Sequence, residues 1–244
     1  MGKSFLSHMQ YTLLVVFMAS YRRSYVFTLG FHEDYIERRL HQTSAKPDDV
    51  VVLFTGKPAI GGVKRAFESL RARSLSIGLP EPKLIELEYE EPSKALYQAR
   101  QVISGLPEPI IADLSGGMRV IVIIVYTALL LEGKHFELYM QPEGSMHMHL
   151  HIPRGIIHCI RNPLSKEKME ILKIIMENPG ITVKELAQTV GRKEKTIINH
   201  MIELKKLNLV VQKGKLAGLY PTQWTPTIIP ETKKIPTNKT KTKK

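Results

Sequence analysis

IIADLSGGMR (residues 110–119) is a short apolar run that ends in an acid, a hydroxyl and two glycines, and the apolar segment Val120 to Leu131 follows it directly. This order is typical of a buried strand, a tight turn and the N-terminus of a helix. Such a turn exposes backbone N–H groups where the helix dipole is positive, so it suits a phosphate or another anion. A connection whose glycines only permit close packing would have the same sequence, so both interpretations remain open.

Strands and helices alternate on both sides of this turn. Strands are predicted over residues 24–29, 48–54, 83–89, 110–114, 136–140 and 146–152, with residues 155–160 as a candidate seventh, and helices over 35–42, 62–77, 93–106 and 118–131. Alternation of this kind produces βα units, so we expect an α/β, Rossmann-like and mostly parallel sheet with flanking helices. Within the last of these helices, Val120 to Leu131 is apolar nearly all round, which predicts either the best-buried helix or a subunit interface.

Ligands of open α/β sheets bind beyond the carboxyl ends of the strands. The predicted pocket therefore consists of the turns after the first, second and fourth strands, which are Gly30–Asp34, Thr55–Lys57 and Asp113–Arg119. The sequence contains no G-x-G-x-x-G after the first strand, no G-x-x-x-x-G-K-[ST] and no G-x-S-x-G. A dinucleotide dehydrogenase, a P-loop NTPase and an α/β-hydrolase are therefore disfavoured.

Metal binding is not expected. His147, His149 and His151 alternate with apolar residues and would share one face of a strand, but no acid or cysteine nearby completes a ligand set. The single cysteine, Cys159, excludes an intrachain disulfide and fits a reducing cytoplasm. We expect neither a metal ion nor a cofactor.

The C-terminal third has the order of a winged helix-turn-helix, which follows the α/β domain. Helices are predicted over 167–178, 182–190 and 193–207, and a β-hairpin follows over 208–221. Thr182 and Glu185 form a capping box, whereas Ser165 with Lys168 provides only half of one. The predicted DNA contacts are polar residues of the third helix and its approach, namely Arg192, Lys193, Lys195, Thr196, Asn199 and His200, together with Lys213 and Lys215 on the wing. Winged helices also serve as protein-interaction modules, so that alternative stays open.

Positive charge is concentrated in the same third. The formal net charge is +12, and residues 164–224 hold eleven Lys and Arg against six Glu, while residues 225–244 hold six Lys against one Glu. This favours a polyanionic partner.

Residues 225–244 are predicted to be a disordered basic tail. Residues 1–17 are predicted to be a non-native or poorly ordered extension, with an extra strand or helix and a targeting signal as the alternatives. The apolar run Tyr11–Ala19 is less than half of the roughly 20 residues that a membrane span needs.

Two stretches resemble a known family. SYVFTLGFHEDYIERRL (residues 24–40) and ADLSGGMR (residues 112–119) resemble the CRISPR-associated Rossmann-fold (CARF) regulators of archaea, specifically the Csa-type CARF–winged-helix transcription factors. The resemblance implies a CARF sensor over 18–160, a linker at 161–163 and a winged helix-turn-helix over 164–224. It also implies a homodimer whose two CARF domains form one pocket for a cyclic oligoadenylate, usually cyclic tetra-adenylate.

The resemblance also implies site residues. Gly30, Phe31, His32 and Glu33 would form a first ligand loop, and Asp113, Ser115, Gly116, Gly117, Met118 and Arg119 a second. Thr55 is added because the turn after the second strand ends at the same edge of the sheet. Ser115 and Arg119 could donate to phosphate, and Phe31 or His32 could contact a base.

The expected function is a ligand-responsive, non-enzymatic transcription regulator of CRISPR loci. It would bind promoter DNA and cyclic tetra-adenylate in the cytoplasm, away from any membrane. Two alternatives remain. The CARF domain could be a ring nuclease in which Ser115 and Arg119 position the ligand's own 2′-hydroxyl for attack, or the regulator could sense another metabolite.

Overall fold

The computed structural model describes residues 22–142, 150–212, 214 and 218–229, and its chain divides into two compact units, Met1–Ile157 and His158–Lys244. The predicted linker at 161–163 does not coincide with this boundary, which falls inside helix α6 (Arg154–Arg161). The prediction of a strand over residues 155–160 is therefore wrong. Pro153 accepts the N–H groups of Ile156 and Ile157 as the helix begins, and Ile157 packs into the core of the first unit.

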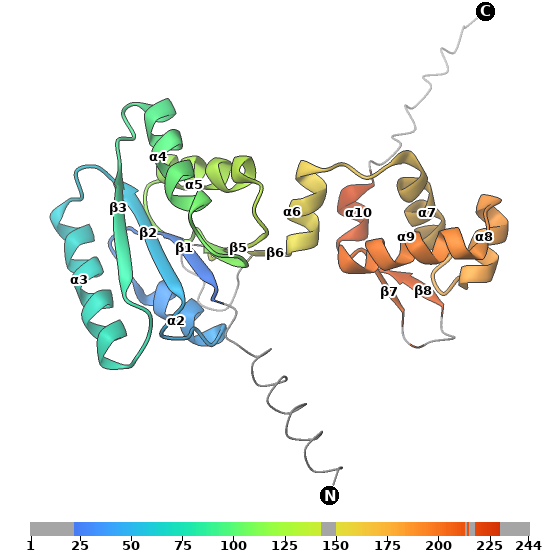
Figure 1. Cartoon of the computed structure of the whole chain (residues 1–244), viewed down its shortest axis with the longest axis horizontal. Helices are drawn as coiled ribbons and strands as arrows, with labels where there is room; N and C mark the ends of the chain where they lie inside the picture. Colours follow the sequence, from blue (N-terminus) through green and yellow to red (C-terminus); the bar gives the residue numbers. More distant parts are fainter. Residues whose placement is uncertain (1–21, 143–149, 213, 215–217, 230–244) are drawn as a thin grey trace, which may run out of the picture. The chain divides into compact units, whose positions relative to one another are not determined.

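The first unit is built on a six-stranded sheet in the order β3-β2-β1-β4-β5-β6 (Figure 1). The strands are β1 (Ser24–Thr28), β2 (Val50–Gly56), β3 (Pro82–Leu87), β4 (Ile110–Asp113), β5 (Phe136–Met140) and β6 (Leu150–Ile152). All neighbouring pairs are parallel except β5 and β6, which are antiparallel. The predicted α/β, Rossmann-like and mostly parallel sheet is confirmed.

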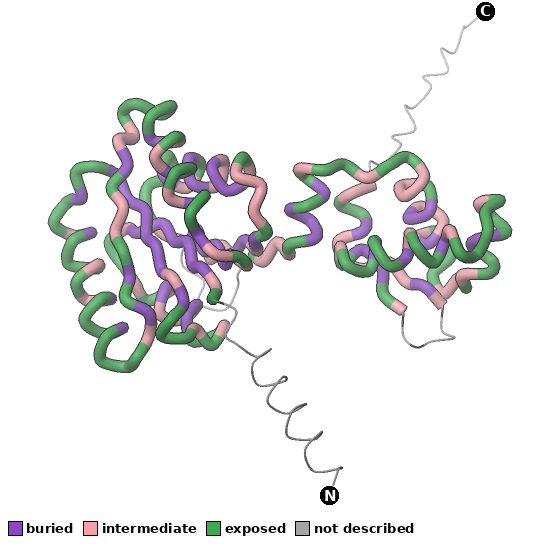
Figure 2. The backbone as a smooth tube through the Cα atoms, in the orientation of Figure 1, coloured by how far each residue is buried: buried purple, intermediate pink, exposed green. Residues whose placement is uncertain are grey.

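Helices cover both faces of this sheet. Helices α2 (Asp34–Gln42) and α3 (Gly61–Ser76) lie on one face, and α4 (Pro92–Ser104) and α5 (Arg119–Glu132) on the other (Figure 1). Each face has its own core because side chains alternate along a strand. Tyr25 and Phe27 belong to the core under α2 and α3, whereas Val26 belongs to the core under α4 and α5. Figure 2 shows the buried strands running between more exposed helices.

Helix α5 is buried along one side only, and its predicted role as a subunit interface stays a prediction. Ile121, Val125 and Ala128 on one side are fully buried. Ile123, on the opposite side, is 63% exposed, and Leu131, at the edge of the buried side in the last turn, is 54% exposed. The helix is therefore a core element that still presents an apolar face to solvent.

The second unit is a winged helix-turn-helix. Helices α7 (Lys166–Glu177), α8 (Val183–Val190) and α9 (Glu194–Lys206) precede the antiparallel hairpin of β7 (Val210–Gln212) and β8 (Leu219–Pro221). Ser165 caps α7 through the backbone N–H of Lys168, and Thr182 with Glu185 forms the complete predicted capping box of α8.

The predicted tail is wrong at its first residues. Thr225–Ile228 form a short helix, α10, in which Thr225 is fully buried. Its hydroxyl donates to the carbonyl of Leu209, which explains why a polar residue is buried at this point. Residues 230–244, residues 1–17 and the predicted strand residues His147 and His149 lie outside the described residues. Within the described residues, no helix is long and apolar enough to cross a membrane.

Candidate functional site

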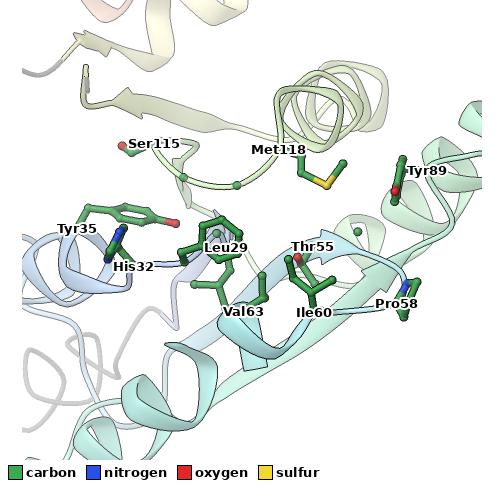
Figure 3. Close-up of a pocket in the computed structure, with 15 residues that line it drawn as sticks. Leu29, His32, Tyr35, Thr55, Pro58, Ile60, Val63, Tyr89, Ser115 and Met118 are labelled. Atoms are coloured by element: carbon green, nitrogen blue, oxygen red, sulfur yellow. The ribbon is translucent and has the colours of Figure 1, made fainter. Parts of the chain in front are cut away.

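The three predicted turns meet in one cleft at the carboxyl edge of the sheet. Strands β1, β2 and β4 run parallel and in register, so the turns that follow them lie side by side. They enclose a cleft of about 570 Å³ (Figure 3). Its walls are formed by Leu29, Gly30, Phe31, His32, Tyr35, Thr55, Gly56, Pro58, Ile60, Val63, Tyr89, Ser115, Gly116, Gly117 and Met118.

The glycines of two of these turns pack the loops against each other. A Cβ on Gly30 would lie 2.8 Å from the backbone nitrogen of Gly117, and one on Gly116 would overlap the ring of Tyr35. Gly117 also has φ +83°, a left-handed conformation that other residues rarely adopt. The Tyr35 hydroxyl donates to the Thr28 carbonyl and thereby fixes the ring under the turn. These glycines therefore provide close packing, and Gly30, Gly116 and Gly117 line the cleft as well.

The acid and the hydroxyl of the turn are directed into the protein. Asp113 is 1% exposed and forms an ion pair with Arg39 at 2.8 Å. The Ser115 hydroxyl donates to the Asp113 carboxylate and accepts the backbone N–H of Gln141 at 2.8 Å. In Figure 3 this hydroxyl points away from the space between Met118 and Ile60. Asp113 therefore stabilises the turn from the protein interior and does not line the cleft. Ser115 does line the cleft, but its hydroxyl bonds to Asp113 and Gln141.

Two helix N-termini border the cleft without the usual caps. Ile60 and Met118 occupy the N-cap positions of α3 and α5, and neither offers a side-chain hydrogen bond to its helix. Neither helix has an acidic residue in its first turn. A helix N-terminus carries unpaired N–H groups and partial positive charge. In the described part of the chain, the cleft wall also includes no carboxylate, so the site favours an anionic ligand.

Eight of the eleven predicted ligand residues line the cleft, and three do not. Asp113 is buried behind it, while Arg119 is the exposed first residue of α5. Glu33 instead borders a shallower hollow beside Arg65. Ile60 and Tyr89 also line the cleft but were not predicted. Tyr89 was placed inside the predicted strand over 83–89, whereas the structure ends β3 at Leu87 and leaves Tyr89 in the turn that follows.

A stack of side chains lies behind the Asp113 turn. The Arg39 guanidinium lies 3.8 Å from the centre of the Tyr139 ring, and that ring stacks on His151 with centroids 4.4 Å apart. Burial, reinforced by the nearby Glu137 carboxylate, raises the pKa of Tyr139 from 10.0 to about 12. His151, which the sequence suggested lies on an exposed strand face, is therefore half-buried against Tyr139 and lies 3.2 Å from Glu137.

The geometry does not assemble the residues named for ring cleavage. The Ser115 hydroxyl bonds to Asp113, and Arg119 is absent from the cleft wall. Among the described residues no group of three His, Cys, Asp or Glu is placed to hold a metal ion.

Helix α9 displays part of the predicted DNA-contact set. Lys193, Lys195 and Asn199 are exposed, and Thr196 is half-buried. Lys213 and Lys215 lie outside the described residues.

Arg192 and His200, also predicted as DNA contacts, face Glu167 on helix α7. The Arg192 guanidinium donates to that carboxylate at 3.0 Å, and His200 Nε2 lies 3.6 Å from it. The His200 side chain is 18% exposed. Glu167 therefore lies beside both residues, but the Arg192 side chain is still 57% exposed, so their contact with DNA stays a prediction.

Comparison with known families agrees with this two-part architecture. The Csa3 CRISPR-associated Rossmann-like domain matches residues 23–153, which is more than half of the chain. The chain belongs to the Csa3 family. A second family, HVO_A0114, matches residues 163–220, within the winged helix-turn-helix.

Csa3 of Saccharolobus solfataricus is 35% identical over 193 residues, which cover 79% of this chain and 81% of the relative. Its name relates it to a CRISPR locus and gives DNA binding as a proposed property. Among solved structures, protein VC1899 of Vibrio cholerae is 9% identical, covers 84% of this chain and 63% of its own, and has a TM-score of 0.38. The multiple antibiotic-resistance repressor MarR of Listeria monocytogenes is 20% identical, covers 27% and 47%, and has a TM-score of 0.26. At these TM-scores neither likeness bears on the site.

Proposed function

We propose that this Csa3 family protein is a homodimeric transcription regulator of CRISPR loci that binds cyclic tetra-adenylate in its cleft and DNA through its winged helix. It would act in the cytoplasm as a regulator and not as an enzyme. The observation that carries the ligand half is the cleft, where two uncapped helix N-termini meet without a carboxylate in the described wall. Such a site provides backbone donors and positive potential for phosphates.

The rest of the cleft suits the bases of the same ligand. Ile60, Pro58, Val63 and Met118 are apolar, and Phe31, His32 and Tyr89 provide ring faces on which a base can stack. A ligand that carries both phosphates and aromatic bases uses both kinds of wall. An oligonucleotide fits this combination better than inorganic phosphate or an apolar metabolite.

A dimer is supported by the apolar face of α5. From Val120 to Leu131 the helix has no charged residue, and Ile123 and Leu131 are more than half exposed. A large exposed apolar face usually marks an interface. In a twofold dimer each cleft has an identical mate, which matches the symmetry of a cyclic tetranucleotide.

DNA binding is supported by the basic charge and by α9. Lys193, Lys195 and Asn199 are exposed on the helix that enters the major groove in this fold. The name of the S. solfataricus relative points the same way. Ligand would change DNA affinity only if it binds two dimer states with different affinity.

A binding assay with one cleft variant tests the ligand half. Calorimetry should detect cyclic tetra-adenylate binding to the purified full chain. Ile60→Asp places a carboxylate at the N-cap of α3, where it stabilises the helix but opposes an anion, so binding should fall strongly while folding is retained. Ile77→Asp, at an exposed isoleucine beyond the other end of the same helix, is the matched control. Equal binding by both variants would contradict the assignment of this cleft.

A gel shift on CRISPR-locus promoter fragments, with and without cyclic tetra-adenylate, tests the DNA half. We expect a shift whose midpoint changes with ligand. A chain that shifts no fragment under either condition would favour a protein-interaction role for the winged helix. Thin-layer analysis of labelled ligand after prolonged incubation should show the ring intact, and a linear product would indicate a ring nuclease.

A further inference from the structure

Helix α9 presents a stripe that mixes polar and apolar side chains. Lys195, Ile198, Asn199 and Ile202 follow the spacing i, i+3, i+4, i+7, which places them along one side of a helix. All four are exposed, with Ile198 at 46% and Ile202 at 49%.

The isoleucines of the stripe are not needed for the fold. The core side of α9 is provided by Ile197, Met201 and Leu204, which are 0–2% exposed. Ile198 and Ile202 point away from that side and are one helical turn apart. Two neighbouring β-branched apolar residues in this position cost helix propensity without contributing to the core of their own unit.

The surroundings of the stripe match DNA rather than an apolar protein surface. Lys193 at the N-cap and Lys205 and Lys206 in the last turn flank it with positive charge. Of the acids on α9, Glu203 is engaged by Lys168, and Glu194 lies in the first turn, where the helix dipole favours it. An apolar strip bordered by lysines is complementary to bases bordered by phosphates.

In the major groove, only thymine presents a methyl group, and adenine presents a donor and an acceptor that an asparagine amide can bind together. The stripe carries one such amide, on Asn199, between the two isoleucines. We propose that α9 reads A·T base pairs, with Asn199 on an adenine and with Ile198 and Ile202 against thymine methyl groups. This proposal rests on the DNA binding proposed above and names the sequence class that it prefers.

Base analogues that remove single groups from the DNA test this proposal. The full chain is used to select duplexes from a random pool, and the selected site is then resynthesised with uracil in place of thymine, one position at a time. Uracil lacks only the methyl group, so one or two positions should lose roughly three- to four-fold in affinity, the amount expected for one buried methyl. Replacement of one adenine by 7-deazaadenine should weaken binding at the position that Asn199 contacts.

Variants assign each effect to its residue. Ile202→Ala should weaken binding to the thymine site and abolish the difference between thymine and uracil at one position, and Asn199→Ala should do the same for 7-deazaadenine. Ile77→Ala, which removes an equally exposed isoleucine from the first unit, should change neither.

These experiments distinguish a failure of the A·T proposal from a failure of the proposed DNA binding. Equal affinity for thymine and uracil sites overturns this proposal while DNA binding stands. Selection that yields no duplex contradicts the proposed function itself, and this proposal with it. If Ile198→Ala or Ile202→Ala instead changes the oligomeric state in sedimentation, the stripe binds a second copy of the chain and the proposal is wrong.

Discussion

The cleft of the first unit and helix α9 of the second use their polar residues in opposite ways. In the cleft turn, Asp113 and the Ser115 hydroxyl bond to groups inside the protein. On α9, Lys195 and Asn199 are exposed and available for a partner. The cleft therefore presents backbone N–H groups and apolar surface to a ligand, whereas α9 presents polar side chains to its partner.

This difference shows that the direction of a polar side chain can be predicted from the sequence on a helix but not in a turn. Periodicity tells which way a helical side chain points. The role of Asp113 depends on Arg39, a residue 74 positions earlier that only the folded chain brings into contact. The following changes test that difference, from the largest expected effect to the smallest.

Asp113→Ala should cause the largest loss of stability. It leaves the Arg39 guanidinium, whose side chain is 8% exposed, without its counter-ion, and breaking a buried pair in this way costs roughly 3–5 kcal/mol. Urea unfolding of the first unit measures the loss. Glu81→Ala is the control because it breaks the exposed Arg71–Glu81 pair, for which at most about 1 kcal/mol is expected. Similar losses in the two variants would show that Asp113 is not a buried support.

Gly117→Ala should destabilise the turn and weaken cyclic tetra-adenylate binding. The left-handed conformation alone costs roughly 1–2 kcal/mol with a side chain, and the new Cβ would lie 3.1 Å from the Leu29 carbonyl oxygen. Gly78→Ala is the matched control, since its φ is +70° and nothing lies within 4 Å of the added atom. Unfolding and calorimetry on both variants separate backbone strain from crowding. An equal cost in both would remove the packing role inferred for Gly117.

Lys195→Ala should lower DNA affinity by a similar factor for all sequences and reduce the slope of log affinity against log salt by about 1, as the loss of one phosphate contact does. Arg192→Ala should change that slope less, because Glu167 already engages its guanidinium. Fluorescence anisotropy across a salt series measures both slopes. A larger change for Arg192 would mean that DNA displaces Glu167.

Tyr139 should produce the smallest effect, visible only at alkaline pH. Its pKa in the folded protein is raised from 10.0 to about 12, so the neutral phenol is favoured by folding. The associated stability is complete below pH 10 and is lost as pH rises from about 10 towards 12. Tyr139→Phe should unfold with a shallower decline across this range, followed by circular dichroism. An identical pH profile in the two proteins would contradict the raised pKa.

Much of the fold could be predicted because the spacing of apolar residues within a single strand or helix shows which side is buried. Strand β5 matches its predicted bounds of 136–140, and the capping box of Thr182 and Glu185 places the start of α8 correctly. The predicted strand over 155–160 was wrong because a short apolar run does not distinguish a strand from a buried helix segment.

The cleft was predicted in place but not in detail. Strand order alone brings Gly30, Thr55 and Met118 to one edge of the sheet, and all three line the cleft. The ion-pair partners of Asp113 and Arg192, which are Arg39 and Glu167, come from distant parts of the sequence. No local pattern encodes such pairings, so the sequence placed these residues near a site without giving their roles.

The buried Thr225 sets the C-terminal boundary of the shortest stable fragment that contains the winged helix. Its hydroxyl donates to Leu209 at the start of the hairpin, and it accepts the backbone N–H of Thr222 at 3.0 Å after the return strand. A protein shortened at Trp224 would lose both of these hydrogen bonds, one at each end of the hairpin. A separately expressed winged helix should therefore extend at least to Ile229, and proteases that trim the C-terminus of the intact chain should stall before they reach Thr225.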